Sequence, residues 1–161
     1  MPSTKQQLIA LGVSALQDEV EALRRAADTT RAGAVHEEAK PENDKDTRAL
    51  EQSYLARGQA QRVVQAEEAL KRLRFCPVVD FDATTPIAVS ALIQLEVDGA
   101  AQWVFLVTAG GGLKLDLDGR SVQLVTPEAP LGRALVGKLV GEGFELRLAG
   151  ALREYEVLSV A

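Results

Sequence analysis

The chain has 161 residues, of which 47% are hydrophobic and 25% charged, a composition typical of a globular protein with one domain or two small ones. Its net charge of −5 argues against broad electrostatic binding to nucleic acid. No uncharged stretch reaches the ~20 residues of a transmembrane helix, and the N-terminus lacks the features of a signal peptide. We therefore expect a cytoplasmic protein with no membrane partner. His36 and Cys76 are each the only residue of their type, which excludes a multi-histidine metal site and an internal disulfide.

The composition changes near Phe75 and divides the chain into two halves. Residues 5–74 contain one proline and three glycines and are rich in Ala, Leu, Glu, Gln and Arg. Residues 76–161 hold four of the six prolines, ten of the thirteen glycines and runs of β-branched residues. This contrast predicts an α+β protein, with a helical domain over 1–75 and a mainly β domain over 76–161.

Two heptad seams predict that the first half is an antiparallel helical hairpin. Spacings of three and four residues join the positions of the first seam, which are Val13, Leu16, Val20, Leu23, Ala27, Thr30 and Ala34. The same spacings join a second seam of Ala49, Ser53, Ala56, Ala60, Val63, Glu67 and Leu70. Facing residues of an antiparallel pair have numbers with a constant sum, and these seams satisfy that rule about a centre next to Pro41. The register sets Glu67 opposite Leu16, its one unfavourable layer, and leaves Leu50 and Tyr54 on the flank.

An acidic cluster lies where the hairpin must turn. Residues 36–48 read HEEAKPENDKDTR and include five carboxylates, Glu37, Glu38, Glu42, Asp44 and Asp46. Pro41 disfavours helix at the preceding residue, and Glu42 and Asp44 suit the start of the returning helix. Helix stability does not account for Glu37 and Glu38, because acids are unfavourable near a helix C-terminus. Such a tip suits either a hard-oxygen Mg²⁺ or Mn²⁺ site completed by a partner, or an electrostatic element that enters a basic channel.

The second half is predicted to form a small curved sheet packed on one short helix. Alternating apolar residues predict a strand over 87–97, which ends in a DG turn at Asp98. Further strands are expected over 102–107, 113–117, 121–125, 144–148 and 154–160, with a helix that begins near Pro130. We expect Trp103 to be a core residue. The Gly110–Gly112 run lacks the spacing of a phosphate-binding loop.

Two stretches of the β half carry a resemblance to a known family. Residues 130–146 read PLGRALVGKLVGEGFEL, and residues 153–160 read REYEVLSV. Together with a helical hairpin that has an acidic tip, they resemble the Gre family of bacterial transcription elongation factors. The motif positions are Pro130, Leu131, Gly132, Ala134, Leu135, Gly137, Lys138, Gly141 and Glu142, with Glu154–Val157 near the end. The resemblance covers nearly the whole chain and implies an FKBP-like C-terminal domain and a coiled-coil arm.

The resemblance also implies an accessory factor of RNA polymerase, not an enzyme. Gre factors dock on the rim of the polymerase secondary channel and insert the arm, whose tip carboxylates help to hold the second catalytic Mg²⁺. The polymerase then hydrolyses the 3′ end of backtracked RNA. Glu42, Glu38 and Asp44 are the expected cleavage residues, with Glu37 and Asp46 as further Mg²⁺ ligands. We expect a monomer that binds no cofactor tightly when isolated and contacts the nascent RNA only indirectly.

The docking surface implied by the resemblance lies around Pro130, Leu131 and Glu128. Glu128–Ala129 replaces the serine-bearing turn that is common in the family. An alternative for Pro130 is that it only starts a helix. Basic residues of the arm such as Arg48, Arg57 and Arg62 are candidates to approach the RNA, and most other charges of the arm are expected to form its solvated faces.

The tip departs from the cleavage pattern of the family. When Glu42 and Asn43 are aligned with the family's Glu-Asn, Ala39 falls on the family's Asp, with Glu38 beside it, and residues 44–46 replace Ala-Glu-Tyr. Three interpretations stay open. The protein is a cleavage factor in which Glu38 or Asp44 takes the role of that Asp, a channel-binding regulator that does not stimulate cleavage, or an FKBP-like binding or chaperone module. The absence of a recognisable aromatic prolyl pocket in the sequence counts against the third.

Overall fold

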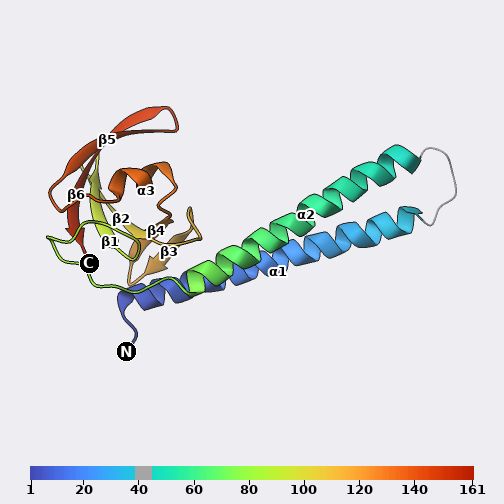
Figure 1. Ribbon diagram of the computed structural model, residues 1–161, viewed down its shortest axis with the longest axis horizontal. Coiled ribbons are helices and arrows are strands. Elements are labelled where there is room, and N and C mark those ends of the chain that lie inside the picture. The colour runs from blue at the N-terminus through green and yellow to red at the C-terminus, as the bar shows by residue number, and fades with distance from the viewer. Residues whose placement is uncertain (39–44) are drawn as a thin grey trace. The chain divides into compact units, whose positions relative to one another are not determined.

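The computed structural model describes residues 1–38 and 45–161, and it describes side chains outside 34–46. Two helices, α1 (Thr4–Glu38) and α2 (Lys45–Arg74), precede a domain of six strands and one short helix, α3 (Pro130–Leu135) (Figure 1). The predicted α+β fold class, a helical hairpin followed by a small β domain, is confirmed. The described residues form two compact units, Ser14–Leu70, here called the arm, and Met1–Val13 with Lys71–Ala161, here called the β unit. None of the helices in these ranges is apolar over a length that would cross a bilayer.

The inward face of α1 in the arm follows the predicted seam. Leu16 and Val20 are buried, and Leu23, Ala27 and Thr30 are half-buried. These positions recur every three or four residues, so their side chains form one stripe along the helix. The side chain of Ala34, the last predicted member, lies outside the described residues.

In α2, the predicted seam residues spaced seven apart are half-buried as expected. Two of the seam residues that lie between them are exposed, so the prediction is wrong there. Ala49, Ala56, Val63 and Leu70 are half-buried as expected, but Ser53 and Ala60 are exposed. Their inward places are taken by Gln52 and Gln59, and Ala66 is buried in the next repeat. Leu50 and Tyr54 are exposed on the flank, as predicted.

An ion pair engages Glu67, the charged member of the predicted α2 seam. The Arg24 guanidinium donates to Glu67 Oε1, with Nε 3.0 Å from that oxygen. Glu67 is half-buried and pairs with Arg24, and Ala66 beside it is buried. In this arrangement the carboxylate contacts both water and a cation. Burial between apolar side chains would remove both contacts and would be energetically unfavourable.

The β unit is built on a six-stranded sheet in the order β3-β4-β2-β1-β6-β5. Its strands are β1 (Leu92–Val97), β2 (Ala100–Leu106), β3 (Lys114–Leu117), β4 (Arg120–Val125), β5 (Gly143–Leu148) and β6 (Ala151–Val160). All neighbours are antiparallel except β2 and β4, which run parallel. Two-residue turns at 98–99 and 118–119, with positive φ at all four residues, close the β1–β2 and β3–β4 hairpins.

Both faces of this sheet carry apolar layers within the β unit. One layer contains Ile93, Leu95, Val104, Leu106 and Val157 with Leu131 and Leu135 of α3. Phe105 and Leu124 point to the other face by strand alternation, and they are fully buried, as are Leu8 and Leu73 at the helix ends. A Cβ on Gly12 would lie 2.8 Å from Leu73 Cδ2 and 3.2 Å from Leu124 Cδ1. The start of α1 and the end of α2 are thus part of the β unit's core.

The strand predicted over 87–97 begins only at Leu92, so the prediction is wrong over 87–91. Ser90 has a φ of 84°, which breaks the extended backbone. The Ile87 N–H donates to the Lys138 carbonyl oxygen at 2.9 Å, and the Gly137 N–H donates to the Ile87 carbonyl oxygen at 2.8 Å. Ile87 and Ala91 are buried as a strand pattern requires, but the backbone bonds of Ile87 go to the turn after α3 and not to a neighbouring strand.

Lys5 fastens the connection between α2 and β1 to the start of α1. Its Nζ donates to the Val79 carbonyl oxygen at 2.5 Å and lies 4.9 Å from the centre of the Phe81 ring. The Val79 N–H donates to Ser90 Oγ at 2.8 Å. Burial lowers the pKa of the Lys5 ammonium, and the nearby Asp80 carboxylate opposes that shift.

Candidate functional site

The acidic cluster stands where α1 ends and α2 begins. Glu38 is the last residue of α1, and Asp46 is the second residue of α2. Glu42 and Asp44 lie in 39–44, outside the described residues, and the side chains of Glu37, Glu38 and Asp46 are not described either. The site predicted at the tip therefore rests on the sequence and on the backbone of the two helix ends.

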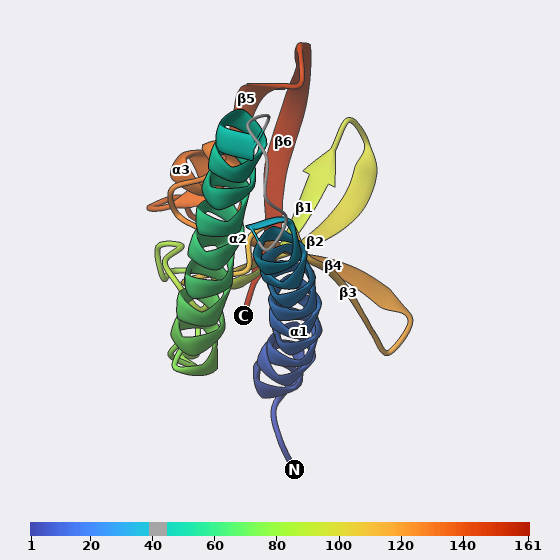
Figure 2. The same cartoon turned by 90° about the vertical axis from the view of Figure 1, so that its right-hand side faces the viewer.

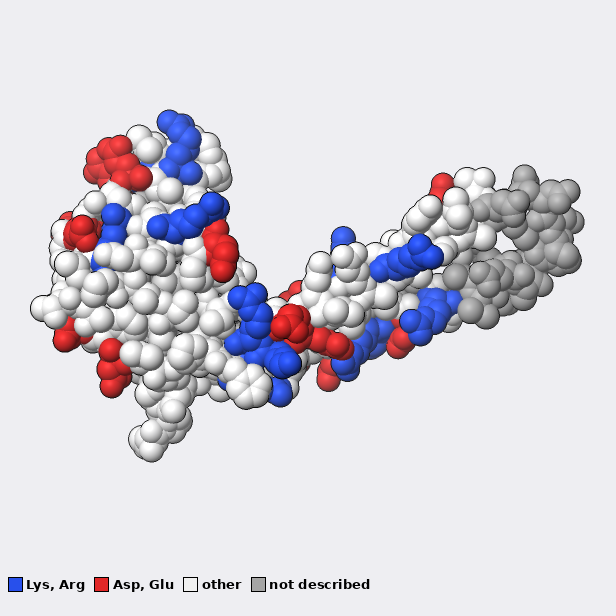
Figure 3. All heavy atoms as spheres, in the orientation of Figure 1, with Lys and Arg blue, Asp and Glu red and all other residues white. Residues whose placement is uncertain are grey.

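The arm below this tip carries both signs of charge. Figure 3 shows Lys and Arg side chains interleaved with Asp and Glu along its described part, on the face in view. Within the described residues, Arg24–Glu67 is the one ion pair. The interleaving leaves no single-sign field on that face, whereas residues 37–46 contain five acids and two lysines.

Residues 130–135 of the Pro130 motif form α3, and the close packing of this helix requires glycine at position 132. Pro130 is the first residue of the helix, where its fixed φ and missing N–H are tolerated. A Cβ on Gly132 would lie 1.9 Å from the Thr126 carbonyl oxygen, so only glycine allows α3 to sit against the 126–129 turn. The Thr126 oxygen also accepts the Ala129 N–H at 3.1 Å. This part of the motif fixes the position of a turn in which the Glu128 side chain is exposed.

The predicted docking residues fall in two environments. Glu128 and Pro130 are exposed, but Leu131 is 7% exposed and belongs to the core. Leu131 therefore holds the turn in place and presents little surface of its own. Two further apolar side chains that sequence reasoning missed, Val136 and Leu139, are exposed directly after α3. The signal that could have found them is their position after a short helix whose inward residues are already Leu131 and Leu135.

The rest of the motif ties α3 to β5 and β6. Glu142 Oε2 accepts the Leu139 N–H at 2.5 Å, and the Gly141 N–H donates to the Val157 carbonyl oxygen at 2.8 Å. Gly137 and Gly141 have φ values of 84° and 88°, which glycine adopts without strain. Lys138 Nζ lies 5.3 Å from the centre of the Phe144 ring. These residues have structural roles that explain their pattern without a direct part in chemistry.

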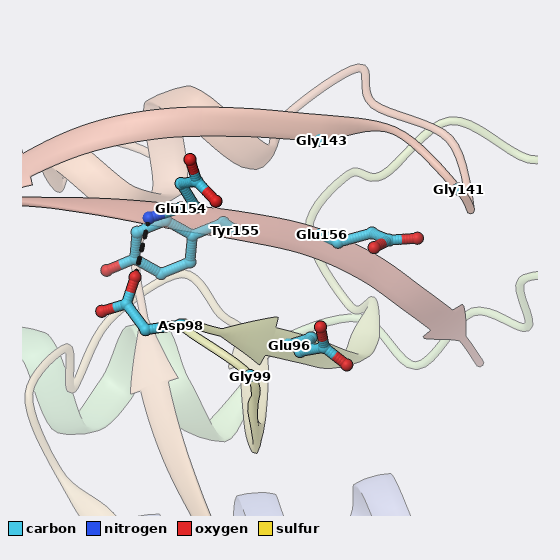
Figure 4. Close-up of a pocket in the computed structure, with 8 residues that line it drawn as sticks. All are labelled: Glu96, Asp98, Gly99, Gly141, Gly143, Glu154, Tyr155 and Glu156. Atoms are coloured by element: carbon cyan, nitrogen blue, oxygen red, sulfur yellow. Dashed lines mark hydrogen bonds between the residues drawn. The ribbon is translucent and has the colours of Figure 1, made fainter.

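The second motif, Glu154–Val157, places an aromatic residue inside and two acids outside. Tyr155 is buried and stacks on Phe144 with ring centres 5.0 Å apart, and burial raises the pKa of its hydroxyl. Glu154 and Glu156 point to the opposite face of β6 and line an open cleft of about 440 Å³ with Glu96 and Asp98. Figure 4 shows these four side chains along β1 and β6.

This acidic cleft arises from strand pairing that sequence reasoning did not detect. Glu96 and Glu156 are directly paired across β1 and β6, where like charges destabilise a sheet. Asp98 Oδ1 accepts the Glu154 N–H at 3.0 Å, and no lysine or arginine lines the cleft in the described β unit. The described residues hold no group of three or more His, Cys, Asp or Glu arranged to bind a metal.

Comparison with known proteins identifies the family. The chain is 29% identical over 158 residues to the transcription elongation factor GreA of Xanthomonas axonopodis pv. citri, covering 93% of each chain. It is 30% identical over 157 residues to GreA of Xylella fastidiosa, covering 92% of each chain. The chain belongs to the Gre family of transcription elongation factors. The resemblance seen in the sequence is therefore confirmed.

Among solved structures, the chain has a low structural similarity to two Gre-type factors. GreA factor homolog 1 of Thermus thermophilus covers 94% of this chain and 95% of its own, with 18% identity and a TM-score of 0.40. The GreA/GreB factor of Nitrosomonas europaea covers 60% of this chain and 78% of its own, with 20% identity and a TM-score of 0.37. No family model matches the sequence.

For this Gre factor, the described structure thus accounts for the C-terminal motifs and leaves the tip to inference. The glycines and Pro130 build α3 and the exposed turn, and Tyr155 anchors β6 in the core. The candidates for a role in chemistry or in partner binding are the carboxylates near the end of the arm and the exposed side chains around α3.

Proposed function

We propose that this Gre factor docks on RNA polymerase at the rim of the secondary channel and inserts its arm so that the tip carboxylates promote cleavage of backtracked RNA. The observation that carries the proposal is the match to elongation factors named GreA over more than nine-tenths of the chain. The protein acts as an accessory factor, because hydrolysis belongs to the polymerase, and a single copy suffices for one channel.

The length of the two helices in the arm supports this proposal. α2 contains 30 residues and is therefore about 45 Å long. α1 and α2 run side by side in the arm. α1 ends at Glu38 and α2 begins at Lys45, so the six residues that separate them in the sequence, 39–44, carry Glu42 and Asp44. An acid at the last residue of α1 is unfavourable for the helix itself, which supports a role toward a partner.

The donor set at the tip fits Mg²⁺. Glu37, Glu38, Glu42, Asp44 and Asp46 offer only carboxylate oxygens, the hard ligands that this ion prefers. When bound, Mg²⁺ assists attack of water on the phosphodiester and stabilises the charge that develops there. We assign Glu38, Glu42 and Asp44 to holding the ion and orienting the water, with Glu37 and Asp46 adding negative charge beside them.

The proposed docking surface comprises Glu128 in the turn before α3, Pro130 at the start of the helix and the apolar side chains after it. Glu128, Pro130, Val136 and Leu139 are exposed within twelve positions of one another in the sequence. Leu131 and Gly132 hold the turn from below. A patch with a charged edge and apolar residues suits a protein partner.

A second candidate function is a channel-binding regulator that does not stimulate cleavage. The observation that favours it is Ala39 at the position where the resemblance places the family's Asp. In that case Glu38 does not reach the ion, and the acidic tip only occupies the channel.

The test uses a purified polymerase stalled in a backtracked complex with labelled RNA at millimolar Mg²⁺. We expect the protein to shorten the RNA, and Glu42→Gln or Glu38→Gln to reduce the rate at least tenfold because each removes a charged oxygen ligand. Glu19→Gln, which neutralises an exposed acid on α1 far from the tip in sequence, is the control and should leave the rate unchanged.

Three results separate the candidates. Shortened RNA that depends on Glu42 and Glu38 supports the cleavage function. Intact RNA, with the protein competing against a Gre factor that cleaves, supports the channel-occupying regulator. A protein that neither binds the polymerase nor changes the RNA contradicts both.

A further inference from the structure

A second cleft in the β unit combines aromatic, amide and cationic side chains. It measures about 540 Å³ and is lined by Gln102, Trp103, Lys114, Arg120, Ser121 and Gln123, with Ala101 and Gly119. Figure 2 shows that the β1–β2 and β3–β4 hairpins diverge, and the β2–β4 pairing begins only at Trp103 and Val122. The residues that line the cleft come from these two hairpins. Neither the tip nor the proposed docking surface uses these residues.

The charges of this cleft favour an anionic ligand. Lys114 and Arg120 are exposed and form no ion pair among the described residues, and no acid belongs to the cleft lining in the described β unit. The Arg120 guanidinium lies over Trp103, 5.1 Å from the ring centre. A stacked guanidinium keeps its N–H edge free for an anion in its own plane, so Arg120 is oriented without being neutralised.

The amides of the cleft favour a ligand that both donates and accepts hydrogen bonds. Gln102 Nε2 donates to Gln123 Oε1 at 3.1 Å. This bond orients both side chains and leaves the Gln102 carbonyl oxygen and the Gln123 amide N–H groups for a ligand. The ends of β2 and β4 that precede Trp103 and Val122 are not paired with each other, so their backbones border the cleft. An extended peptide offers alternating donors and acceptors to such an edge.

The surroundings decide between a peptide and a nucleic acid. A polynucleotide carries a phosphate at every nucleotide, whereas the cleft offers two cations in a chain of net charge −5. Asp116 and Asp118 lie in the same β3–β4 hairpin and would repel a longer polyanion. From these contacts and charges we infer that the cleft binds an extended acidic peptide segment of a partner protein, with its carboxylates on Lys114 and Arg120.

The test uses Trp103, the only tryptophan of the chain, as its reporter. The full chain is titrated at low salt with the blocked peptide Gly-Glu-Val-Glu-Gly while tryptophan emission is recorded. We expect a saturable change that weakens about tenfold in Lys114→Gln and in Arg120→Gln, the loss expected for one charged hydrogen bond. Arg153→Gln, which removes an exposed arginine from β6, is the control and should bind like the parent protein.

Matched probes make the inference falsifiable. The peptide Gly-Gln-Val-Gln-Gly, inorganic phosphate and an oligothymidylate are titrated in the same way, and circular dichroism confirms that each variant is folded. Binding of the Glu peptide alone, weakened by salt and by both cleft variants, supports the inference. It is overturned if no probe changes the emission, if the Gln peptide binds equally well, or if phosphate or the oligonucleotide binds and the Glu peptide does not.

Discussion

At the level of single residues, Gly132 carries the strongest steric demand of the β unit. Its φ is not in the left-handed region, so alanine would be favoured there by about 1 kcal/mol on helix propensity alone. A Cβ at this position would nevertheless overlap the Thr126 carbonyl oxygen at 1.9 Å. We expect Gly132→Ala to lower the free energy of unfolding by about 3 kcal/mol, as overpacking does, measured by urea unfolding with Trp103 fluorescence.

The control for Gly132 is a glycine in a helix with empty space around it. A Cβ on Gly58 of α2 would meet nothing within 4 Å, so Gly58→Ala should stabilise α2 by about 0.5–1 kcal/mol, followed by circular dichroism. If Gly132→Ala is as stable as the parent protein, the steric account of the Pro130 motif is wrong. The same variant should weaken competition for the polymerase, because the turn with Glu128 and Pro130 must move.

At the level of elements, the inward face of α2 contains a buried polar atom that lowers the stability of the arm. Gln59 Oε1 is buried and has no hydrogen-bond partner among the described residues. A carbonyl oxygen in that state costs about 1–3 kcal/mol, so Gln59→Leu should stabilise the arm by about 1 kcal/mol. Hydrogen exchange of the α2 amides, read by mass spectrometry, measures the change in the arm without interference from the β unit.

Gln61→Leu is the matched control for that change. Gln61 is exposed on the same helix, so the same substitution should alter protection of the α2 amides by less than about 0.5 kcal/mol. Equal effects of the two substitutions would mean that helix propensity, not the buried oxygen, decides the result.

The sequence predicts which segments form helices and strands better than it predicts which of their residues point inward. The α1 seam follows from Leu16, Val20 and Leu23, because large apolar residues at heptad spacing have no other favourable place. In α2, small and polar residues stand next to each other at 52–53 and 59–60, so hydrophobicity cannot choose the inward one. The β1 boundary was missed for a different reason: Ile87 alternates like a strand residue, but its bonds to the 137–138 turn are tertiary.

Neither the acidic cleft nor the cleft around Trp103 could be predicted, because each depends on strand register. Glu96 and Glu156 face each other because β1 pairs with β6, although the two residues are about sixty positions apart in the sequence. Gln102 and Gln123 form a hydrogen bond at the place where β2 and β4 diverge. The composition of the arm tip, by contrast, could be read directly, because it is continuous in the chain.

At the level of the whole molecule, the β unit is assembled from two separate segments of the chain. The sequence suggested a boundary at Phe75, but the β unit also contains Met1–Val13 and Lys71–Arg74. Leu8 and Leu73 are fully buried in this unit, and Leu73 lies against Gly12. Helix ends far apart in sequence therefore complete the core beneath Phe105 and Leu124.

Two truncated proteins test this division. In one, residues 1–13 are joined through a Gly/Ser linker of about six residues to residues 71–161, a linker that spans about 13 Å. In the other, only residues 76–161 are kept. We expect the first to unfold in urea near the midpoint that Trp103 fluorescence reports for the full chain. The second should lose several kcal/mol, since loss of a single buried leucine side chain costs about 2–5 kcal/mol.

The same pair of proteins separates folding from function. The linked protein keeps Glu128, Pro130, Val136 and Leu139, so it should still compete for the polymerase, but it lacks the tip and should not shorten backtracked RNA. A protein of residues 76–161 that is as stable as the linked one would show that Leu8 and Leu73 are dispensable and that the sequence boundary is the true one. Cleavage by the linked protein would contradict the assignment of Glu38 and Glu42, because it retains neither.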